Sequence, residues 1–143
     1  MEILTRPRAI SKLLSANDTG ANFSHQAGIL VPKVKEVLSF FPDLGTEAKN
    51  PRVVLSFEDI SGEKWSFNFI YYNGKLFGGT RNEYRLTGMT RFIKSNNLRA
   101  GDKITFLRLP DDKLLVKYQR MNGNNASNLD ILKLRNNWRV VIV

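Results

Sequence analysis

The clearest pattern in the chain lies in residues 64–72, which read Lys64-Trp65-Ser66-Phe67-Asn68-Phe69-Ile70-Tyr71-Tyr72. Trp65, Phe67 and Phe69 alternate there with polar residues, which is typical of a β-strand with one face against a core. The run before it, residues 53–59, is also strand-like, and Ser61-Gly62 between the two runs predicts a turn. We therefore expect the two runs to pair as an antiparallel hairpin.

The apolar runs on either side predict further strands and two short helices. Pro32, followed by apolar residues at helical spacing, indicates a helix over 32–41, and a second helix is expected over 90–97. The other strands are expected at residues 9–14, 27–31, 81–85, 103–109, 113–120 and 138–143. Seven or eight strands at hairpin spacing predict a mainly β, mostly antiparallel, barrel-like fold. A length of 143 residues with 42% hydrophobic residues predicts a single domain over residues 1–143.

The charge balance points to a polyanionic partner. Lys and Arg total 22 and Asp and Glu total 13, so the formal net charge is +9. A small domain this basic is biased toward DNA, RNA or an acidic membrane surface. The basic residues are densest over 71–99, a stretch that contains six basic residues and one acidic residue. A basic surface kept for solubility is the alternative explanation.

Composition excludes several classes of function. Cysteine is absent, so the chain has no disulfide, no thiol nucleophile and no cysteine-based zinc site. The single histidine, His25, excludes a histidine-rich metal site within one copy of the chain. No run of 18 apolar residues and no signal-peptide pattern occur, so we expect a reducing cytoplasm and no membrane contact. No catalytic residue, metal ligand or cofactor site is predicted.

One segment spells the letters of a PD…ExK nuclease signature, namely Pro42-Asp43 followed by Glu47-Ala48-Lys49. In that chemistry Asp and Glu bind a divalent metal ion while Lys stabilises charge at the phosphate. The two halves need separate strands, whereas here three residues of loop-like sequence intervene. A small metal-dependent nuclease is kept only as an alternative. Magnesium-dependent cleavage that is abolished by Glu47→Ala would support it.

A second pattern, Arg81-Asn82-Glu83-Tyr84-Arg85, is suited to reading DNA. In a strand Arg81, Glu83 and Arg85 share one face, and Asn82 and Tyr84 share the other. Arg binds guanine O6 and N7 bidentately, Glu accepts from the cytosine amine, and Asn can read adenine. The Arg–Glu–Arg face is therefore a chemically plausible reader of G·C pairs. An ion-pair ladder on a solvated face is the alternative.

The polar segment 15–26 offers a mixed set of hydrogen-bond donors and acceptors. Such side chains suit base edges, while nearby lysines suit phosphates. For Asn17 and Asp18, a capping or Asx-turn role is the alternative. The candidates in and around this segment are Asn17, Asp18, Thr19, His25, Gln26, Lys12, Lys33 and Lys35.

Two blocks of sequence stand out for their order and spacing. They are Lys12-Leu13-Leu14-Ser15-Ala16-Asn17-Asp18-Thr19-Gly20-Ala21 with His25-Gln26, and Ile70-Tyr71-Tyr72-Asn73, Phe77-Gly78 and Thr80-Arg81-Asn82-Glu83 with Arg85. Together they resemble the N-terminal effector domain of EcoRII-type restriction endonucleases. The rest is similar to the wider plant B3 DNA-binding family through Trp65 and Phe67, Leu86-Thr87-Gly88, Phe92 and the segment 98–106. The resemblance covers roughly residues 9–109.

The resemblance implies a seven-stranded, B3-like DNA-binding pseudobarrel with two arms that clamp duplex DNA from its major-groove side. The N-arm would be about residues 12–26 and the C-arm about residues 74–87. The implied target is 5′-CCWGG or a related G·C-flanked site. Leu13 and Gly79 stand where the family has basic residues, so an altered target stays open. The implied base-reading residues are Arg81, Asn82, Glu83, Arg85, His25, Asn17 and Asp18. The candidates for backbone contacts are Lys12, Thr19, Gln26, Lys33, Lys75, Thr80, Arg91 and Lys94.

The resemblance also implies a role as the recognition part of a type II restriction endonuclease in a bacterial cytoplasm. The isolated domain would be a monomer, and the nuclease domain would not be in this chain. A B3-type transcription regulator is an alternative that the sequence does not separate from it. A non-specific RNA or single-strand binder needs exposed aromatic platforms, whereas the aromatic residues here mostly follow core-like alternation.

Overall fold

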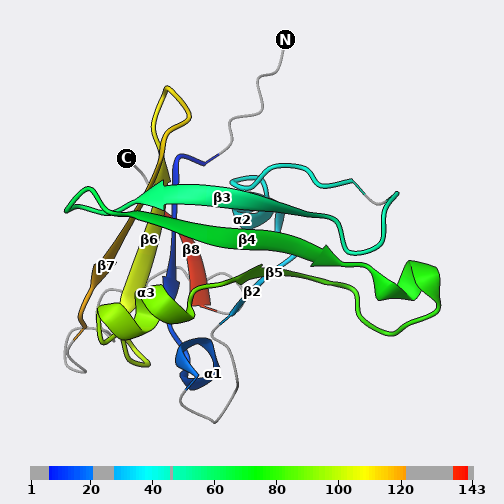
Figure 1. Ribbon diagram of the computed structural model, residues 1–143, viewed down its shortest axis with the longest axis horizontal. Helices are drawn as coiled ribbons and strands as arrows, with labels where there is room; N and C mark the ends of the chain where they lie inside the picture. The colour runs from blue at the N-terminus through cyan, green and yellow to red at the C-terminus, as the bar shows by residue number, and fades with distance from the viewer. Residues whose placement is uncertain (1–6, 21–27, 46, 122–136, 142–143) are drawn as a thin grey trace.

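One curled sheet makes up the fold (Figure 1). The computed structural model describes residues 7–20, 28–45, 47–121 and 137–141, and within these ranges eight strands join in the order β2-β5-β4-β3-β7-β6-β1-β8. Neighbouring strands are antiparallel except β3 and β7, which pair in parallel. In chain order the strands are β1 Ala9–Leu13, β2 Ile29–Val31, β3 Arg52–Glu58, β4 Lys64–Tyr72, β5 Glu83–Thr87, β6 Lys103–Arg108, β7 Leu114–Gln119 and β8 Trp138–Val141.

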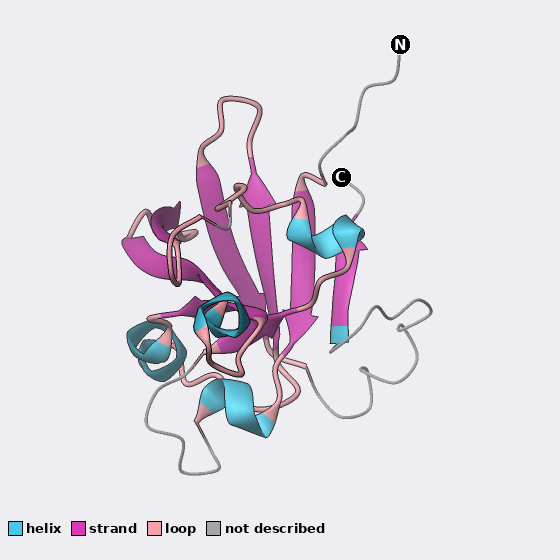
Figure 2. Cartoon of the chain, turned by 90° about the vertical axis from the view of Figure 1, so that its right-hand side faces the viewer, coloured by secondary structure: helices cyan, strands magenta, loops and turns pink. Residues whose placement is uncertain are grey.

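Short helices fill some of the connections between strands and form no layer of their own (Figure 2). They are α1 Ala16–Thr19, α2 Lys35–Leu38, the 3-10 helix η1 Gly74–Phe77 and α3 Thr90–Ser95. None of the helices in the described ranges is long and apolar enough to span a membrane.

The predicted hairpin of β3 and β4 is confirmed. Phe57 lies opposite Trp65, and the pairing continues along the whole of β3. The turn between the strands is built around the side chain of Asp59, which accepts hydrogen bonds from the backbone of Ser61 and Glu63, at 2.9 Å each, and from the indole of Trp65 at 2.9 Å. The turn therefore joins the ends of both strands, which sets the register of the hairpin.

The core lies on the inner face of the curled sheet. Phe67 and Phe69 on β4 are buried, as their alternation predicts, and Phe57 and Phe106 join them from β3 and β6. Phe92 on α3 packs edge-on against Phe67, with ring centroids 5.7 Å apart. Each fully buried phenylalanine stabilises the fold by about 1.5–3 kcal/mol relative to an exposed one. The aromatic alternation of β4 therefore places large side chains in the core that the curled sheet encloses.

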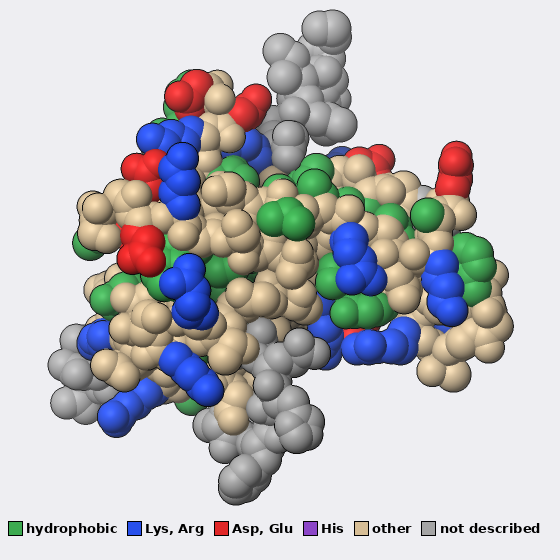
Figure 3. Space-filling model, in the orientation of Figure 1, with side chains coloured by type: hydrophobic (Ala, Val, Ile, Leu, Met, Phe, Trp, Pro, Cys, Tyr) green, Lys and Arg blue, Asp and Glu red, His purple; other side chains and the backbone are tan. Residues whose placement is uncertain are grey.

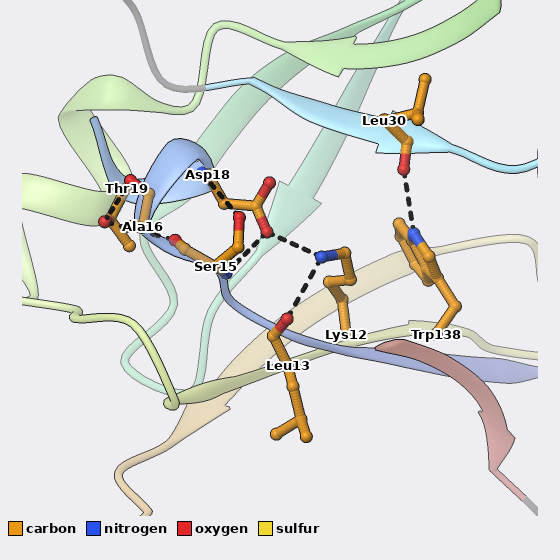
Figure 4. Close-up of polar contacts among 8 residues, drawn as sticks. All are labelled: Lys12, Leu13, Ser15, Ala16, Asp18, Thr19, Leu30 and Trp138. Atoms are coloured by element: carbon orange, nitrogen blue, oxygen red, sulfur yellow. Dashed lines mark hydrogen bonds and ion pairs between the residues drawn. The ribbon is translucent and has the colours of Figure 1, made fainter. Parts of the chain in front are cut away.

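The two edge strands of the sheet meet through a side chain. The indole N–H of Trp138, on β8, donates a hydrogen bond of 3.0 Å to the backbone oxygen of Leu30, on β2 (Figure 4). Trp138 is fully buried. Since β2 and β8 are the first and last strands in the sheet order, this bond connects the two margins of the open barrel.

The mainly β fold class is confirmed. Eight strands are present in the described ranges, which agrees with the seven or eight expected from the sequence pattern and is one more than the resemblance implies. The helices differ from the two expected, because three short α-helices and one 3-10 helix are present in these ranges. The helix expected over 32–41 is limited to Lys35–Leu38. Phe40 and Phe41 leave it to enter the core, where Phe41 stacks on Phe69 with ring centroids 4.4 Å apart.

Candidate nucleic-acid interface

A cleft of about 590 Å³ opens between the two predicted arms. The C-arm, formed by the end of β4, η1 and the start of β5, runs out from the body of the protein, while α1 lies below the sheet (Figure 1). The cleft is lined by side chains from both arms and from the sheet between them. These are Lys12, Ser15, Asn17, Asp18, Gly28, Leu30, Tyr72, Arg81, Arg85, Thr87 and Asn137.

The charges on the face shown in Figure 3 are unevenly distributed. Lys and Arg side chains gather over the part where β4, β5 and η1 lie and again around α3, whereas most acidic side chains lie in the upper half of the view (Figure 3). On this face the part around α3 and the part over β4, β5 and η1 are therefore more basic than the upper part (Figure 3). This polarity fits an electrostatic footprint for a polyanion.

The base of the C-arm is anchored by Asn73, whose side chain is fully buried. Its oxygen accepts from the backbone N–H of Asn50 (2.8 Å), and its amide donates to the backbone oxygen of Ala48 (2.8 Å). Near the tip, Gly79 donates to the oxygen of Gly74 at 2.7 Å. A Cβ on Gly79 would lie 3.2 Å from that oxygen, so a larger residue would require the backbone of Gly74 to shift by a few tenths of an ångström.

Arg81, Glu83 and Arg85 lie in a row on one face of the C-arm, as the strand period predicts. Glu83 Oε2 accepts from Arg81 Nη2 at 3.1 Å and from Arg85 Nε at 2.6 Å. Partial burial works to raise the pKa of Glu83, but the hydrogen bond and charge of Arg85, together with those of Arg81, outweigh it and lower the pKa below its ordinary value. The ion-pair ladder is thus present, and base reading by these residues stays a prediction.

Asn82 comes just before β5, which begins at Glu83 rather than at Arg81 as expected, and its side chain is bonded to β4. The hydroxyl of Tyr71 donates to the side-chain oxygen of Asn82. Tyr71 also stacks on Tyr84 with ring centroids 4.3 Å apart. Burial, with Tyr71 and Asp43 nearby, raises the pKa of the Tyr84 hydroxyl. Adenine reading by Asn82 stays a prediction, and its side-chain oxygen is already engaged within the protein.

The N-arm begins with a capped helix, which replaces part of the expected loop. The N–H of Asp18 donates to Ser15 Oγ (3.1 Å), and the N–H of Ser15 donates to Asp18 Oδ2 (2.9 Å), so the two residues form a capping box. The alternative role proposed for Asp18, a helix cap, is therefore observed. Lys12 Nζ lies 2.7 Å from Asp18 Oδ2 (Figure 4).

The charges of Lys12 and Asp18 are turned toward each other. The residues are only 4% and 6% exposed, although both line the cleft. Direct contacts of these two side chains with DNA stay predictions that the geometry of the free domain does not favour. Of the other N-arm candidates, Asn17 is exposed at the cleft, and the hydroxyl of Thr19 donates to the backbone oxygen of Ala16 at 3.0 Å. His25 and Gln26 lie outside the described residues.

The remaining candidates for backbone contacts are exposed but do not line the cleft. Arg91 stacks on the ring of Trp65, with its guanidinium carbon 4.4 Å from the ring centroid. The ammonium of Lys33 lies 5.8 Å from the centroid of the Tyr71 ring. Phosphate contacts by the group stay predictions. Its members are Lys33, Lys75, Thr80, Arg91 and Lys94.

Sequence reasoning missed Tyr72 as a residue of the cleft. It stacks under Arg81, whose guanidinium carbon lies 4.2 Å from the centre of the Tyr72 ring. A signal existed, because the period of two places Tyr72 on the face of β4 that holds Ser66, Asn68 and Ile70, opposite the core aromatics Trp65, Phe67 and Phe69. A large aromatic residue at the end of that face, outside the aromatic core pattern, is a candidate for recognition.

The PD…ExK letters lie on a connection without regular structure. Asp43 Oδ1 accepts from the N–H of Gly45 at 3.0 Å, and Glu47 and Lys49 are exposed. Among the described residues, no group of three or more His, Cys, Asp or Glu side chains is placed to hold a metal ion.

Comparisons with known proteins agree with this geometry. Residues 8–109 match the family described as "Restriction endonuclease EcoRII, N-terminal". The chain is 40% identical over 105 residues to the type II restriction enzyme EcoRII of Escherichia coli, which covers 71% of this chain and 26% of that protein. It is 31% identical over 109 residues to the AP2/ERF and B3 domain-containing transcription factor RAV1 of Arabidopsis thaliana, which covers 74% of this chain and 30% of that protein. The solved Arabidopsis FUS3–DNA complex matches with a TM-score of 0.60 at 21% identity, over 78% of this chain and 96% of that chain.

A curled β-sheet with two arms beside a cleft that is lined by basic side chains is the architecture of a small DNA-binding domain. The chain belongs to the EcoRII-N family and has the B3-like DNA-binding pseudobarrel fold. The resemblance drawn from the sequence is thereby confirmed. The match spans 26% of EcoRII and 30% of RAV1, so the activities of those whole proteins are a separate question.

Proposed function

We propose that this chain is the target-recognition domain of a type II restriction endonuclease, and that it binds double-stranded DNA at 5′-CCWGG or a related G·C-flanked site without cleaving it. The observation that carries the proposal is the row of Arg81, Glu83 and Arg85 beside a cleft whose other wall is the N-arm. Arginine forks match the O6 and N7 acceptors of guanine, and the row supplies two of them at neighbouring positions.

The proposed role in restriction depends on similarity to known proteins. The identity of 40% to EcoRII supports restriction, with a nuclease domain elsewhere in the full-length protein and a bacterial cytoplasm as its location. The isolated domain would bind as a monomer. The identity of 31% to RAV1 supports a second candidate, a transcription regulator that uses the same fold. The full-length gene separates the two, because a nuclease domain accompanies recognition only in the first.

The test is a binding titration with two short duplexes of equal length, one containing 5′-CCWGG and one with the same bases scrambled. It is done at about physiological salt and without magnesium, since electrostatic binding to any sequence grows as salt is lowered. A preference of roughly 10³-fold or more is expected of a specific protein. Equal affinity for the two duplexes would contradict the proposed target, and selection from a randomised duplex library would then define the sequence bound.

A further inference from the structure

Arg81 is an exposed arginine at the cleft whose side chain and backbone are both held by contacts within the C-arm. Its side chain is 56% exposed, yet its guanidinium is bonded to Glu83 and stacked on Tyr72. Its backbone is fixed as well, because the oxygen of Arg81 accepts from the N–H of Lys75 at 3.0 Å. An arginine on a projecting arm would otherwise sample many rotamers. These contacts define one direction for its donors.

Tyr72 provides the face on which the guanidinium lies. It is the last residue of β4 and lies directly opposite Glu83 in the pairing with β5. A guanidinium stacked on a ring keeps its N–H groups in its own plane, at the edge of the stack. One of these donors reaches Glu83, and others are left for a base edge in the cleft, which Tyr72 and Arg81 both line.

We propose that Tyr72 is a positioning residue for DNA recognition: by stacking under Arg81 it fixes the direction of the guanidinium and so sets selectivity at the base pair that Arg81 reads. This inference rests on the proposed function. Tyr71, the neighbouring residue, points to the other face, where it stacks on Tyr84 and binds Asn82. The two consecutive tyrosines therefore have separate roles, one toward the cleft and one toward the body of the arm.

The experiment compares Tyr72→Leu and Tyr72→Phe with the wild type on the 5′-CCWGG duplex, on its single-base-pair variants and on the scrambled duplex. Arg81→Ala identifies which base pair Arg81 reads. Tyr72→Leu should lower affinity for the site by about 3- to 30-fold and should lose preference at that same base pair. Affinity for scrambled DNA and the salt dependence should stay the same. Tyr72→Phe keeps the ring and should stay within about twofold of the wild type.

Tyr118→Leu is the matched control. Tyr118 also lies beside an arginine, with Arg120 at 5.3 Å from its ring centroid, but it is on β7 and does not line the cleft. The Tyr118→Leu variant should bind every duplex with the affinity of the wild type. The double variant Tyr72→Leu/Arg81→Ala should bind no more weakly than Arg81→Ala alone, because the two residues act as a unit. If Tyr72→Leu does not fold, Tyr72→Thr replaces it, since threonine suits a strand and also lacks the ring.

The outcomes separate this inference from the proposed function. Suppose that the wild type prefers its site. If Tyr72→Leu then keeps the wild-type base preference, or binds every duplex more weakly by the same factor, the inference about Tyr72 is overturned and the proposed function is not. A wild type without preference for 5′-CCWGG overturns the proposed target, and the same variants are then measured on the duplex selected from the randomised library. A wild type for which no duplex is selected overturns both.

Discussion

Lys12 and Asp18 form an ion pair of 2.7 Å in which the side chains are only 4% and 8% exposed. The pair joins β1 to α1, because Asp18 is also the acidic residue of the helix cap. Each of these buried charges has lost its hydration, and the attraction between the two charges offsets that cost. The pair therefore fixes where the N-arm begins relative to the sheet.

The first prediction concerns this pair. Asp18→Asn leaves the ammonium of Lys12 buried without its counter-charge, which costs about 3–5 kcal/mol for a buried pair. We expect the free energy of unfolding in urea to fall by that amount. Asp112→Asn is the control, because Asp112 is exposed in a turn and its backbone already has a positive φ of 68°, which asparagine tolerates. A loss for Asp18→Asn no larger than that of the control would contradict the role given to the pair.

The second prediction concerns base reading by Arg81 and Arg85. Replacing either with Ala should cost about 1–3 kcal/mol of binding to the site and should relax the base preference at one position. Lys75→Ala is the comparison, because an exposed lysine that contacts a phosphate should weaken all sequences alike and should reduce the salt slope by about one. Affinities for a panel of single-base-pair variants measure both effects. Equal weakening on every duplex by the arginine variants would exclude base reading by them.

The third prediction follows from Asp59 in the turn of the β3–β4 hairpin. The hydrogen bonds from Trp65 and then Ser61 lower the pKa of this carboxyl from 3.8 to about 2. Because the folded pKa is below the unfolded one, the stability that Asp59 contributes is fully present above the unfolded pKa and is lost as the pH falls through the folded pKa. Urea unfolding of the wild type and of Asp59→Asn should therefore differ at neutral pH and converge toward pH 2. A difference that does not change with pH would show that these bonds do not favour the ionised form.

The fourth prediction concerns the bond between Trp138 and Leu30. Trp138→Phe keeps most of the ring but leaves the Leu30 oxygen without this donor, and we expect a loss of about 1–3 kcal/mol in the free energy of unfolding. Phe106→Leu is the control, because Phe106 is a fully buried ring that packs against Trp138 without any side-chain hydrogen bond, so its loss measures packing alone. An equal or smaller loss for Trp138→Phe would mean that the bond between the sheet margins adds little to the stability.

The part of the fold that sequence could predict is the part that depends on local alternation. The pattern around Trp65, Phe67 and Phe69 predicts β4 and its hairpin, because every second side chain must enter the core. The same period predicts the shared face of Arg81 and Arg85. Both follow from strand geometry alone, without knowledge of distant contacts.

The features that sequence could not predict depend on partners brought together by folding. Lys12 looks like an exposed lysine until α1 forms and places Asp18 beside it. The loop-forming residues of that segment hid the helix, although Ser15 and Asp18 have the spacing of a capping box. The partner of Trp138 is the backbone of Leu30, which no side-chain pattern reveals. The role of Tyr72 likewise needs Arg81 to fold back over its ring.

The bond from Trp138 to Leu30 also gives the domain an optical probe of its own. The chain has two tryptophans, so a variant with Trp65 replaced would emit from Trp138 alone. That indole is shielded from solvent, and it is bonded directly to a residue that lines the cleft. Occupation of the cleft by a duplex would then be followed as a change in intrinsic fluorescence, without a dye on either molecule.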